Sequence, residues 1–249
     1  MGEVIAITSG KGGVGKTTMT AGLGAALASM GKKVLAVDLD IGTGDLDMKM
    51  RLENKVVYNL LDVLEGSCKI LQALVKDPEQ EMLYLLPSPA SRDMQSVSAR
   101  QLIRLMQIFK KEFDYVLIDT KAGMGDSFLN AIASADRALI VTTPDRAALK
   151  GTMQLLHMLD PEKLRRSALL INRLRLDLLK TGETMDPEAL VEKAGLPLLG
   201  ITLEDDDILL MNDSEGSVID VASVACRSFK NIAGRILGEN IPIVLKGRK

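Results

Sequence analysis

The sequence predicts an α/β fold of the doubly wound type, in which helices cover both faces of a mostly parallel sheet. Three observations support this prediction. Runs of Val, Ile and Leu of strand length are apolar on both faces, which is typical of buried parallel strands. Patterns with helical spacing alternate with these runs, as right-handed crossover connections require. A glycine-rich loop, residues 10–18, lies between the first apolar run and the first helical pattern.

The expected elements follow one another along the chain. Each expected strand is a short apolar run that ends near a polar or turn residue, and the set is Val4–Thr8, Lys33–Asp38, Leu83–Leu86, Tyr115–Asp119, Ala138–Thr142, Ala168–Asn172 and Leu198–Thr202. Each expected helix carries apolar residues at helical spacing, and the set is Lys16–Met30, Val57–Glu65, Ser98–Lys111, Ser127–Ala133, Arg146–Leu159, Pro187–Ala194 and Val218–Leu237. Ligands of such sheets bind beyond the carboxyl ends of the strands, so we expect the functional residues there.

Composition narrows the domain organisation and the function classes. With 249 residues, 47% of them hydrophobic, we expect one P-loop domain over residues 1–238 and a short C-terminal tail over residues 239–249. The net charge of −2 gives no overall attraction to nucleic acid or to an anionic membrane, although a local basic patch stays open, and the 3% of aromatic residues argue against stacking on single-stranded nucleic acid as the main function. Cys68 and Cys226 stand alone, which argues against a zinc or iron–sulfur site. Without a signal segment or a run of about 18 apolar residues, a cytoplasmic location is expected.

The loop from Gly10 to Thr18 reads Gly-Lys-Gly-Gly-Val-Gly-Lys-Thr-Thr and matches the phosphate-loop pattern G-x-x-x-x-G-K-[ST]. In such loops backbone N–H groups surround phosphate oxygens, the lysine (Lys16) reaches the terminal phosphates, and the following hydroxyl (Thr17) binds Mg²⁺. The start of the next helix adds its partial positive charge. An ordinary glycine-rich turn is the alternative. The candidate nucleotide-binding residues are Gly10, Gly12, Gly13, Val14, Gly15, Lys16, Thr17 and Thr18.

A second lysine, Lys11, occupies a position that the phosphate-loop pattern leaves free. No carboxylate lies near it in the sequence, so we interpret it as a catalytic residue. A solvated surface lysine is the alternative.

Three acidic residues follow expected strands. Asp119 ends an apolar strand as a Walker B carboxylate does, which makes it a candidate for the Mg²⁺ shell. Asp38 and Asp40 lie close together at the end of another strand, and we expect the two carboxylates to have different roles. A cap of the following turn or helix is the alternative for each strand end.

Together these residues resemble the deviant phosphate loop of the MinD/ParA ATPase family, and the likeness extends over nearly the whole chain. It is closest to the MinD branch and is carried by residues 4–18, 38–47, 56–58, 119–123 and 238–239. The resemblance implies that Lys11 reaches across a dimer interface to the partner's nucleotide. It also implies that Asp38 supports Mg²⁺ and that Asp40 positions the attacking water. It adds Gly123 to the nucleotide-binding residues and implies that the Asn172 amide contacts adenine, with a turn residue as the alternative for Asn172.

The function implied by this resemblance is that of an ATPase that binds ATP/ADP with Mg²⁺, dimerises with ATP and regulates the placement of the division septum. MinC-like and MinE-like partners and the inner face of the cell membrane are implied as well. A ParA-type or flagellum-positioning ATPase and an ATP-binding scaffold with weak hydrolysis are the alternatives. Nucleic acid is not expected as a partner, because dense basic runs are limited to residues 163–166 and 173–180.

The chain departs from the family pattern in three places. In residues 119–123 Lys121 replaces the proline of the second switch, and residues 42–47 lack the arginine of the first switch. We expect these changes to affect hydrolysis and partner contacts. In the tail, Pro242 and the short length argue against a membrane-surface helix. A weak membrane contact that depends on avidity and a frayed tail are the alternatives.

Overall fold

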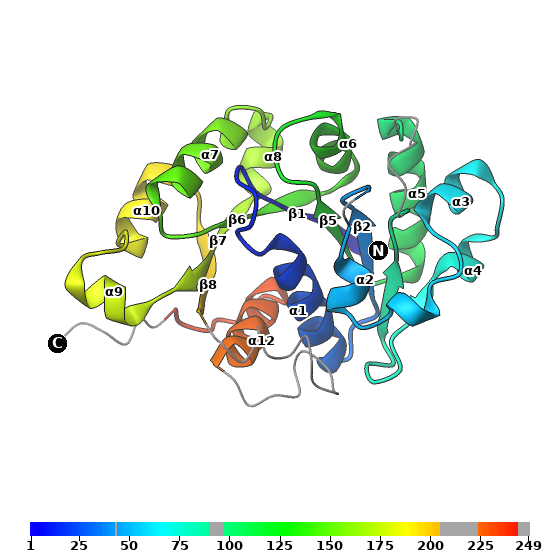
Figure 1. The fold of residues 1–249 in the computed structure, drawn as a ribbon, viewed down its shortest axis with the longest axis horizontal. Helices are drawn as coiled ribbons and strands as arrows, with labels where there is room; N and C mark the ends of the chain where they lie inside the picture. Colours follow the sequence, from blue (N-terminus) through cyan, green and yellow to red (C-terminus); the bar gives the residue numbers. More distant parts are fainter. Residues whose placement is uncertain (43, 90–96, 205–223, 244–249) are drawn as a thin grey trace.

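The sheet is the central layer of the molecule. The computed structural model describes residues 1–42, 44–89, 97–204 and 224–243. Within these residues eight strands form one sheet in the order β3-β4-β2-β5-β1-β6-β7-β8 (Figure 1). Every described strand pair is parallel except β3 with β4. The strands are β1 Glu3–Thr8, β2 Val34–Leu39, β3 Val75–Lys76, β4 Leu83–Leu86, β5 Tyr115–Thr120, β6 Arg137–Thr142, β7 Ala168–Leu174 and β8 Leu198–Leu203.

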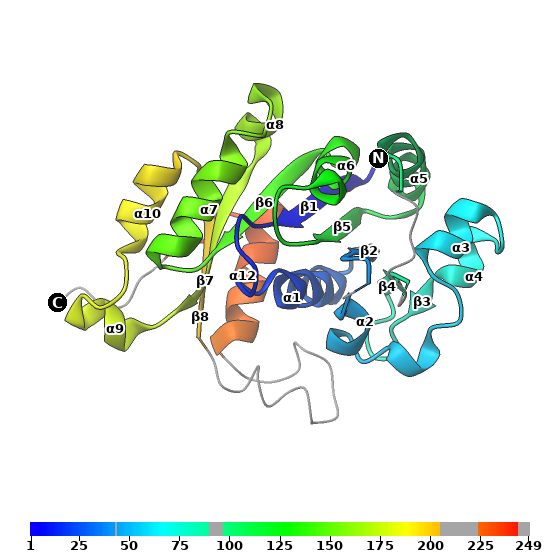
Figure 2. The same ribbon diagram turned by 45° about the horizontal axis from the view of Figure 1, so that its top comes forward.

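Helices cover both faces of the sheet, as Figure 2 shows from a second direction. The described helices are α1 Lys16–Ser29, α2 Leu46–Lys49, α3 Leu60–Glu65, α4 Ile70–Ala73, α5 Ala99–Glu112, α6 Asp126–Ser134, α7 Arg146–Leu156, α8 Pro161–Arg166, α9 Leu176–Thr181, α10 Pro187–Ala194 and α12 Val224–Ile236, with a 3₁₀ turn at Glu53–Lys55. Alternate residues of a strand serve opposite cores. Val4 and Ala6 pack into the core under α5, α6 and α7, and Ile5 and Ile7 pack into the core under α1 and α12.

The doubly wound, mostly parallel fold predicted from the sequence is confirmed. All seven expected strands are present, and their ends differ from the expected ones by at most two residues. The antiparallel edge strand β3 was missed, because two residues carry no periodic signal. The short helices α2, α4, α8 and α9 were also missed.

Two expected helices differ from the structure by three residues at one end, and a third begins in residues that lie outside the described part, while the others agree within one residue. Helix α3 begins three residues later than expected, because the Asn59 side chain caps it by accepting hydrogen bonds from the N–H groups of Leu61 and Asp62. Helix α7 ends at Leu156 rather than at Leu159. For the expected helix 218–237, residues 218–223 lie outside the described part, and α12 ends at Ile236.

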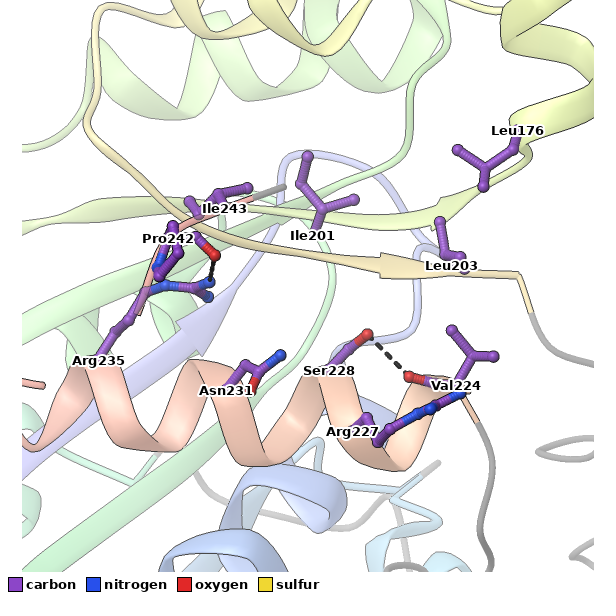
Figure 3. Close-up of a pocket in the computed structure, with 10 residues that line it drawn as sticks. All are labelled: Leu176, Ile201, Leu203, Val224, Arg227, Ser228, Asn231, Arg235, Pro242 and Ile243. Atoms are coloured by element: carbon purple, nitrogen blue, oxygen red, sulfur yellow. Dashed lines mark hydrogen bonds between the residues drawn. The ribbon is translucent and has the colours of Figure 1, made fainter. Parts of the chain in front are cut away.

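The described C-terminal residues return to strand β8, the last strand of the sheet. The Arg235 guanidinium donates hydrogen bonds to the carbonyl oxygens of Leu199, Ile241 and Pro242 at 3.1, 2.8 and 3.1 Å (Figure 3 draws Arg235 beside Pro242). A cavity of about 470 Å³ lies between β8 and α12, with Ile243 at its wall. No helix in the described part of the chain is long and apolar enough to cross a membrane. The tail residues 244–249, on which the membrane contact was expected, lie outside the described residues.

Candidate nucleotide-binding site

The candidate residues lie at one edge of the sheet, where the parallel strands end. Strand β5 lies between β2 and β1, so that Asp119 is aligned with Asp38 on one side and with Ile7 on the other. The phosphate loop follows directly after β1. Side chains that are far apart in the sequence therefore meet around this loop, as the fold class predicted.

Three positions of the loop require glycine, for two different physical reasons. Gly13 and Gly15 have φ angles of 75° and 93°, in the left-handed region that glycine adopts without strain. Gly10 has another reason to be glycine, because a Cβ atom there would lie 2.0 Å from the Gly151 carbonyl group of α7. Close contact with α7 therefore also requires glycine at this position.

Lys16 lies among acidic side chains and is largely buried, with 7% of its surface exposed. Burial lowers the pKa of its ammonium group, and the nearby charges of Asp119, Asp40 and Asp45 oppose that shift. The Thr20 hydroxyl donates a hydrogen bond to Asp119 Oδ1 at 3.4 Å, and the nearby Thr17 hydroxyl opposes the rise in the pKa of the Asp119 carboxyl group. This places the loop lysine and the loop hydroxyl together with the predicted Walker B carboxylate.

Asp38 and Asp119 form a buried pair of carboxyl groups, each 1% exposed. Burial is the largest cause that raises their pKa values, to about 7 for Asp38 and about 8 for Asp119. The Asp40 N–H and the Ser88 hydroxyl donate hydrogen bonds to Asp38 at 2.8 and 3.2 Å. A cation near these oxygens would stabilise the ionised forms.

The donor set fits a Mg²⁺ ion that shares its ligands with a nucleotide. Among the described residues no group of three or more His, Cys, Asp and Glu side chains could hold a metal ion alone. Mg²⁺ is usually bound through one or two protein oxygens, with phosphates and water completing the shell. Asp38, Asp119 and the Thr17 hydroxyl supply such oxygens.

Lys11 differs from Lys16 in its surroundings. Its side chain is 43% exposed, and its Nζ lies 3.2 Å from Oδ1 of Asp145. Asp145 caps α7 by accepting a hydrogen bond from the Ala148 N–H at 2.9 Å, and it accepts another from the Thr143 hydroxyl at 2.6 Å. Lys11 thus has a carboxylate partner that is remote in the sequence, although none lies near it along the chain.

On the other side of the loop, a β-bulge in β7 presents two side chains to loop carbonyl groups. The register with β8 shifts between Ile171 and Leu174, and Arg173 has a φ of 56°, unusual for a residue with a side chain. The Asn172 Nδ2 group donates to the Val14 carbonyl oxygen at 2.7 Å, and Arg173 Nη1 donates to that of Gly13 at 3.2 Å. The predicted adenine contact of Asn172 remains a prediction. Sequence reasoning missed these loop contacts.

The two switch segments also approach the loop or its carboxylates. Gly123 has a φ of 103°, and a Cβ atom at Gly12 would come within 3.7 Å of the Ala122 side chain. In the first switch, a Cβ atom at Gly44 would lie 2.2 Å from the Ser88 hydroxyl and 2.3 Å from Asp38 Oδ2. The backbone at Gly44 therefore lies directly against the Asp38 carboxylate, and a side chain at this position would clash with it.

The fold and the loop define a P-loop nucleotide-binding protein, and comparisons with known proteins agree. The family model described as "AAA domain" matches residues 2–171. The septum site-determining protein MinD of Bacillus subtilis is 45% identical over 246 residues, which cover 98% of this chain and 92% of that protein. The chain belongs to the MinD family, as the resemblance implied.

Solved structures give the same result. The MinC:MinD cell division protein complex of Aquifex aeolicus superposes with a TM-score of 0.91 at 35% identity, covering 99% of this chain and 100% of that one. MinD of Pyrococcus horikoshii, complexed with Mg-ADP, gives a TM-score of 0.83 at 29% identity and covers 97% and 100%. The nucleotide and magnesium in that relative agree with the donor set described above.

Proposed function

We propose that this protein is a Mg²⁺-dependent ATPase of the MinD type, which dimerises when it binds ATP and takes part in placing the division septum. The observation that carries the proposal is the contrast between its two loop lysines. Lys16 is buried among carboxylates, where a phosphate chain and a metal ion fit. Lys11 is exposed at the rim of the same loop, where it can reach a second molecule.

Each residue of the site has a role in this hydrolysis. The N–H groups of the loop and Lys16 bind the phosphates, and Thr17 with Asp38 and Asp119 holds Mg²⁺. When bound by these oxygens, Mg²⁺ would offset the negative charge of the phosphates. Asp40, next in line after β2 and close enough to Lys16 to affect its pKa, orients the attacking water.

Dimerisation requires Lys11 to change its partner. In the structure of the single chain, Lys11 pairs with Asp145. An ion pair this exposed contributes only about 0–1 kcal/mol to stability. A nucleotide phosphate of the second subunit offers more negative charge. We therefore assign Lys11 to the nucleotide of the partner subunit, as the family resemblance implies.

The partners proposed for this chain follow from its family. A MinD relative has been seen in complex with MinC, and we propose a MinC-like protein as a partner here. A MinE-like activator and the cytoplasmic face of the membrane are proposed on the resemblance alone. Lys121, which is exposed in the second switch, is the residue expected to alter hydrolysis or partner contacts relative to other members of the family.

Light scattering with ADP and with ATP tests the proposal, using the variant Asp40→Ala to slow hydrolysis. We expect a monomer with ADP and a dimer of twice the mass with ATP. Adding Lys11→Ala to the same background should keep ATP bound but return the protein to a monomer. A monomer with ATP in the single variant would refute the dimer, and absence of ATP binding would refute the nucleotide function itself.

A further inference from the structure

Two carbonyl groups of the phosphate loop accept hydrogen bonds from side chains of strand β7. In a planar trans peptide unit, the C=O of one residue and the N–H of the next point in opposite directions. The Val14 carbonyl oxygen points to Asn172, so the Gly15 N–H points away from β7. The Gly13 carbonyl oxygen points to Arg173, so the Val14 N–H also points away from β7. Fixing two carbonyl groups thereby fixes the direction of two potential phosphate donors.

The bulge in β7 makes this double contact achievable. In a regular strand, consecutive side chains point to opposite faces of the sheet, so neighbours such as Asn172 and Arg173 would diverge. The left-handed conformation of Arg173 and the register shift beside it bring both side chains to the same loop. Strained conformations of residues with side chains persist where the surrounding structure holds them, and they cluster at functional sites.

A third residue supports Asn172 from β8. The Thr202 hydroxyl donates a hydrogen bond to the Asn172 Oδ1 atom, and Thr202 is 1% exposed. With its oxygen accepting from Thr202, the Asn172 amide is oriented so that its NH₂ group faces the Val14 carbonyl. Gly15 leaves room for this amide, because a Cβ atom there would lie 2.3 Å from Asn172 Nδ2.

We propose that Asn172, Arg173 and Thr202 are positioning residues that hold the phosphate loop with its N–H groups directed at the nucleotide phosphates. Asn172 then acts on the polyphosphate rather than on the base. This inference rests on the proposed nucleotide function. It adds to the nucleotide site three residues that lie outside the loop motif and hold the loop in place.

Binding measurements on Asn172→Ala separate the two roles of this residue. A fluorescent ADP analogue is titrated, and ATP and inorganic tripolyphosphate, which has no base, compete with it. A buried hydrogen bond to the loop is lost, so we expect both competitors to bind about tenfold more weakly. If ATP binding weakens while tripolyphosphate binding is unchanged, the side chain contacts the base and the proposal is wrong.

Matched variants distinguish positioning from general destabilisation. Asn130 on α6 makes the same kind of bond away from the loop, from its Nδ2 to the Val97 carbonyl oxygen at 2.7 Å. We expect Asn130→Ala to lower thermal stability while leaving both affinities within about twofold of the wild type. If Asn130→Ala weakens binding as much as Asn172→Ala does, the effect is one of stability, and the proposal fails.

Thr202 provides an independent test that removes a single hydroxyl. Thr202→Val should weaken tripolyphosphate and ATP binding by about three- to tenfold, and Thr202→Ser, which keeps the hydroxyl, should restore most of it. Equal affinities for all three proteins would overturn the role of Thr202. If the wild type itself binds neither competitor, the proposed nucleotide function fails, which is a different result from normal wild-type binding with unaffected variants.

Discussion

The two flanks of the phosphate loop are built from different interactions. The acidic flank, at the ends of β2 and β5, places Asp119 and Asp40 near Lys16 and Asp38 beside Asp119. The support flank, at the ends of β7 and β8, places Asn172 and Arg173 with Thr202 behind them and holds backbone carbonyl groups by hydrogen bonds. In the proposed function, the acidic flank would supply charge for phosphate chemistry and the support flank would supply the geometry of the loop. A change on the acidic flank should therefore affect turnover, and a change on the support flank should affect affinity.

The largest effect is expected at the centre of the acidic flank. Lys16→Ala removes the ammonium group that we propose for the terminal phosphates, and it removes a positive charge close to the Asp119 carboxyl group. We expect ATP turnover to fall by about 100- to 1,000-fold, the usual loss when one donor to a developing charge is removed. Steady-state phosphate release measures it. A variant that keeps more than about a tenth of the wild-type turnover would contradict the assignment.

A second change on the same flank should separate chemistry from binding. Asp40→Asn keeps the shape but removes the charge that would orient water, so we expect turnover to fall by about 100-fold. The affinity for ADP should change less than about threefold, because ADP lacks the γ-phosphate that the water attacks. Asp160→Asn is the control, since Asp160 caps the distant helix α8 and its substitution should leave turnover unchanged. Parallel losses of turnover and ADP affinity would argue against a role confined to catalysis.

A smaller effect is expected at Asp145, which borders the loop on the β6 side. Asp145→Asn weakens the pairing with Lys11 but keeps an oxygen that can accept the Ala148 N–H at the start of α7. Because Lys11 is then released more easily, the ATP-bound dimer should form at a protein concentration about two- to fivefold lower, in line with the small energy of an exposed ion pair. Analytical ultracentrifugation of the Asp40→Ala background with ATP provides the measurement. Weaker dimerisation would show instead that Asp145 helps to place Lys11 for its partner.

The contrast between the flanks also explains what could be predicted from the sequence. Lys16 and Thr17 belong to one contiguous motif, and Asp119 ends an apolar strand, so local patterns were enough to find them. The contacts of Asn172 and Arg173 with the loop join residues about 160 positions apart and depend on the strand order and on a bulge. Neither feature has a periodic signal. The carboxylate partner of Lys11 was missed for the same reason, because only the fold brings Asp145 to the loop.

Gly44 shows a second limit of prediction from the sequence. In the sequence, the first switch lacks the arginine of the family pattern, and we expected this difference to change contacts with partner proteins. In the structure the position is occupied by backbone packed against Asp38 and Ser88, where no side chain fits without movement. The steric reason could not be predicted, since Ser88 approaches only through the pairing of β2 with β4.

The smallest expected effect compares two buried threonines that differ in one hydrogen bond. Thr152 on α7 is 1% exposed, as Thr202 is, but its hydroxyl makes no hydrogen bond to any described residue. Removing an unpaired buried hydroxyl relieves a desolvation cost, so Thr152→Val should raise the free energy of unfolding by about 1 kcal/mol and the Tm by about 2–4 °C. Calorimetry measures both, and the affinity for ATP should stay as in the wild type. The same substitution at Thr202 should instead weaken nucleotide binding, because that hydroxyl orients Asn172 toward the loop. If the two substitutions had the same effect on ATP affinity, the hydrogen bond from Thr202 to Asn172 would have no positioning role. The support flank would then contribute to stability only, as ordinary core packing does.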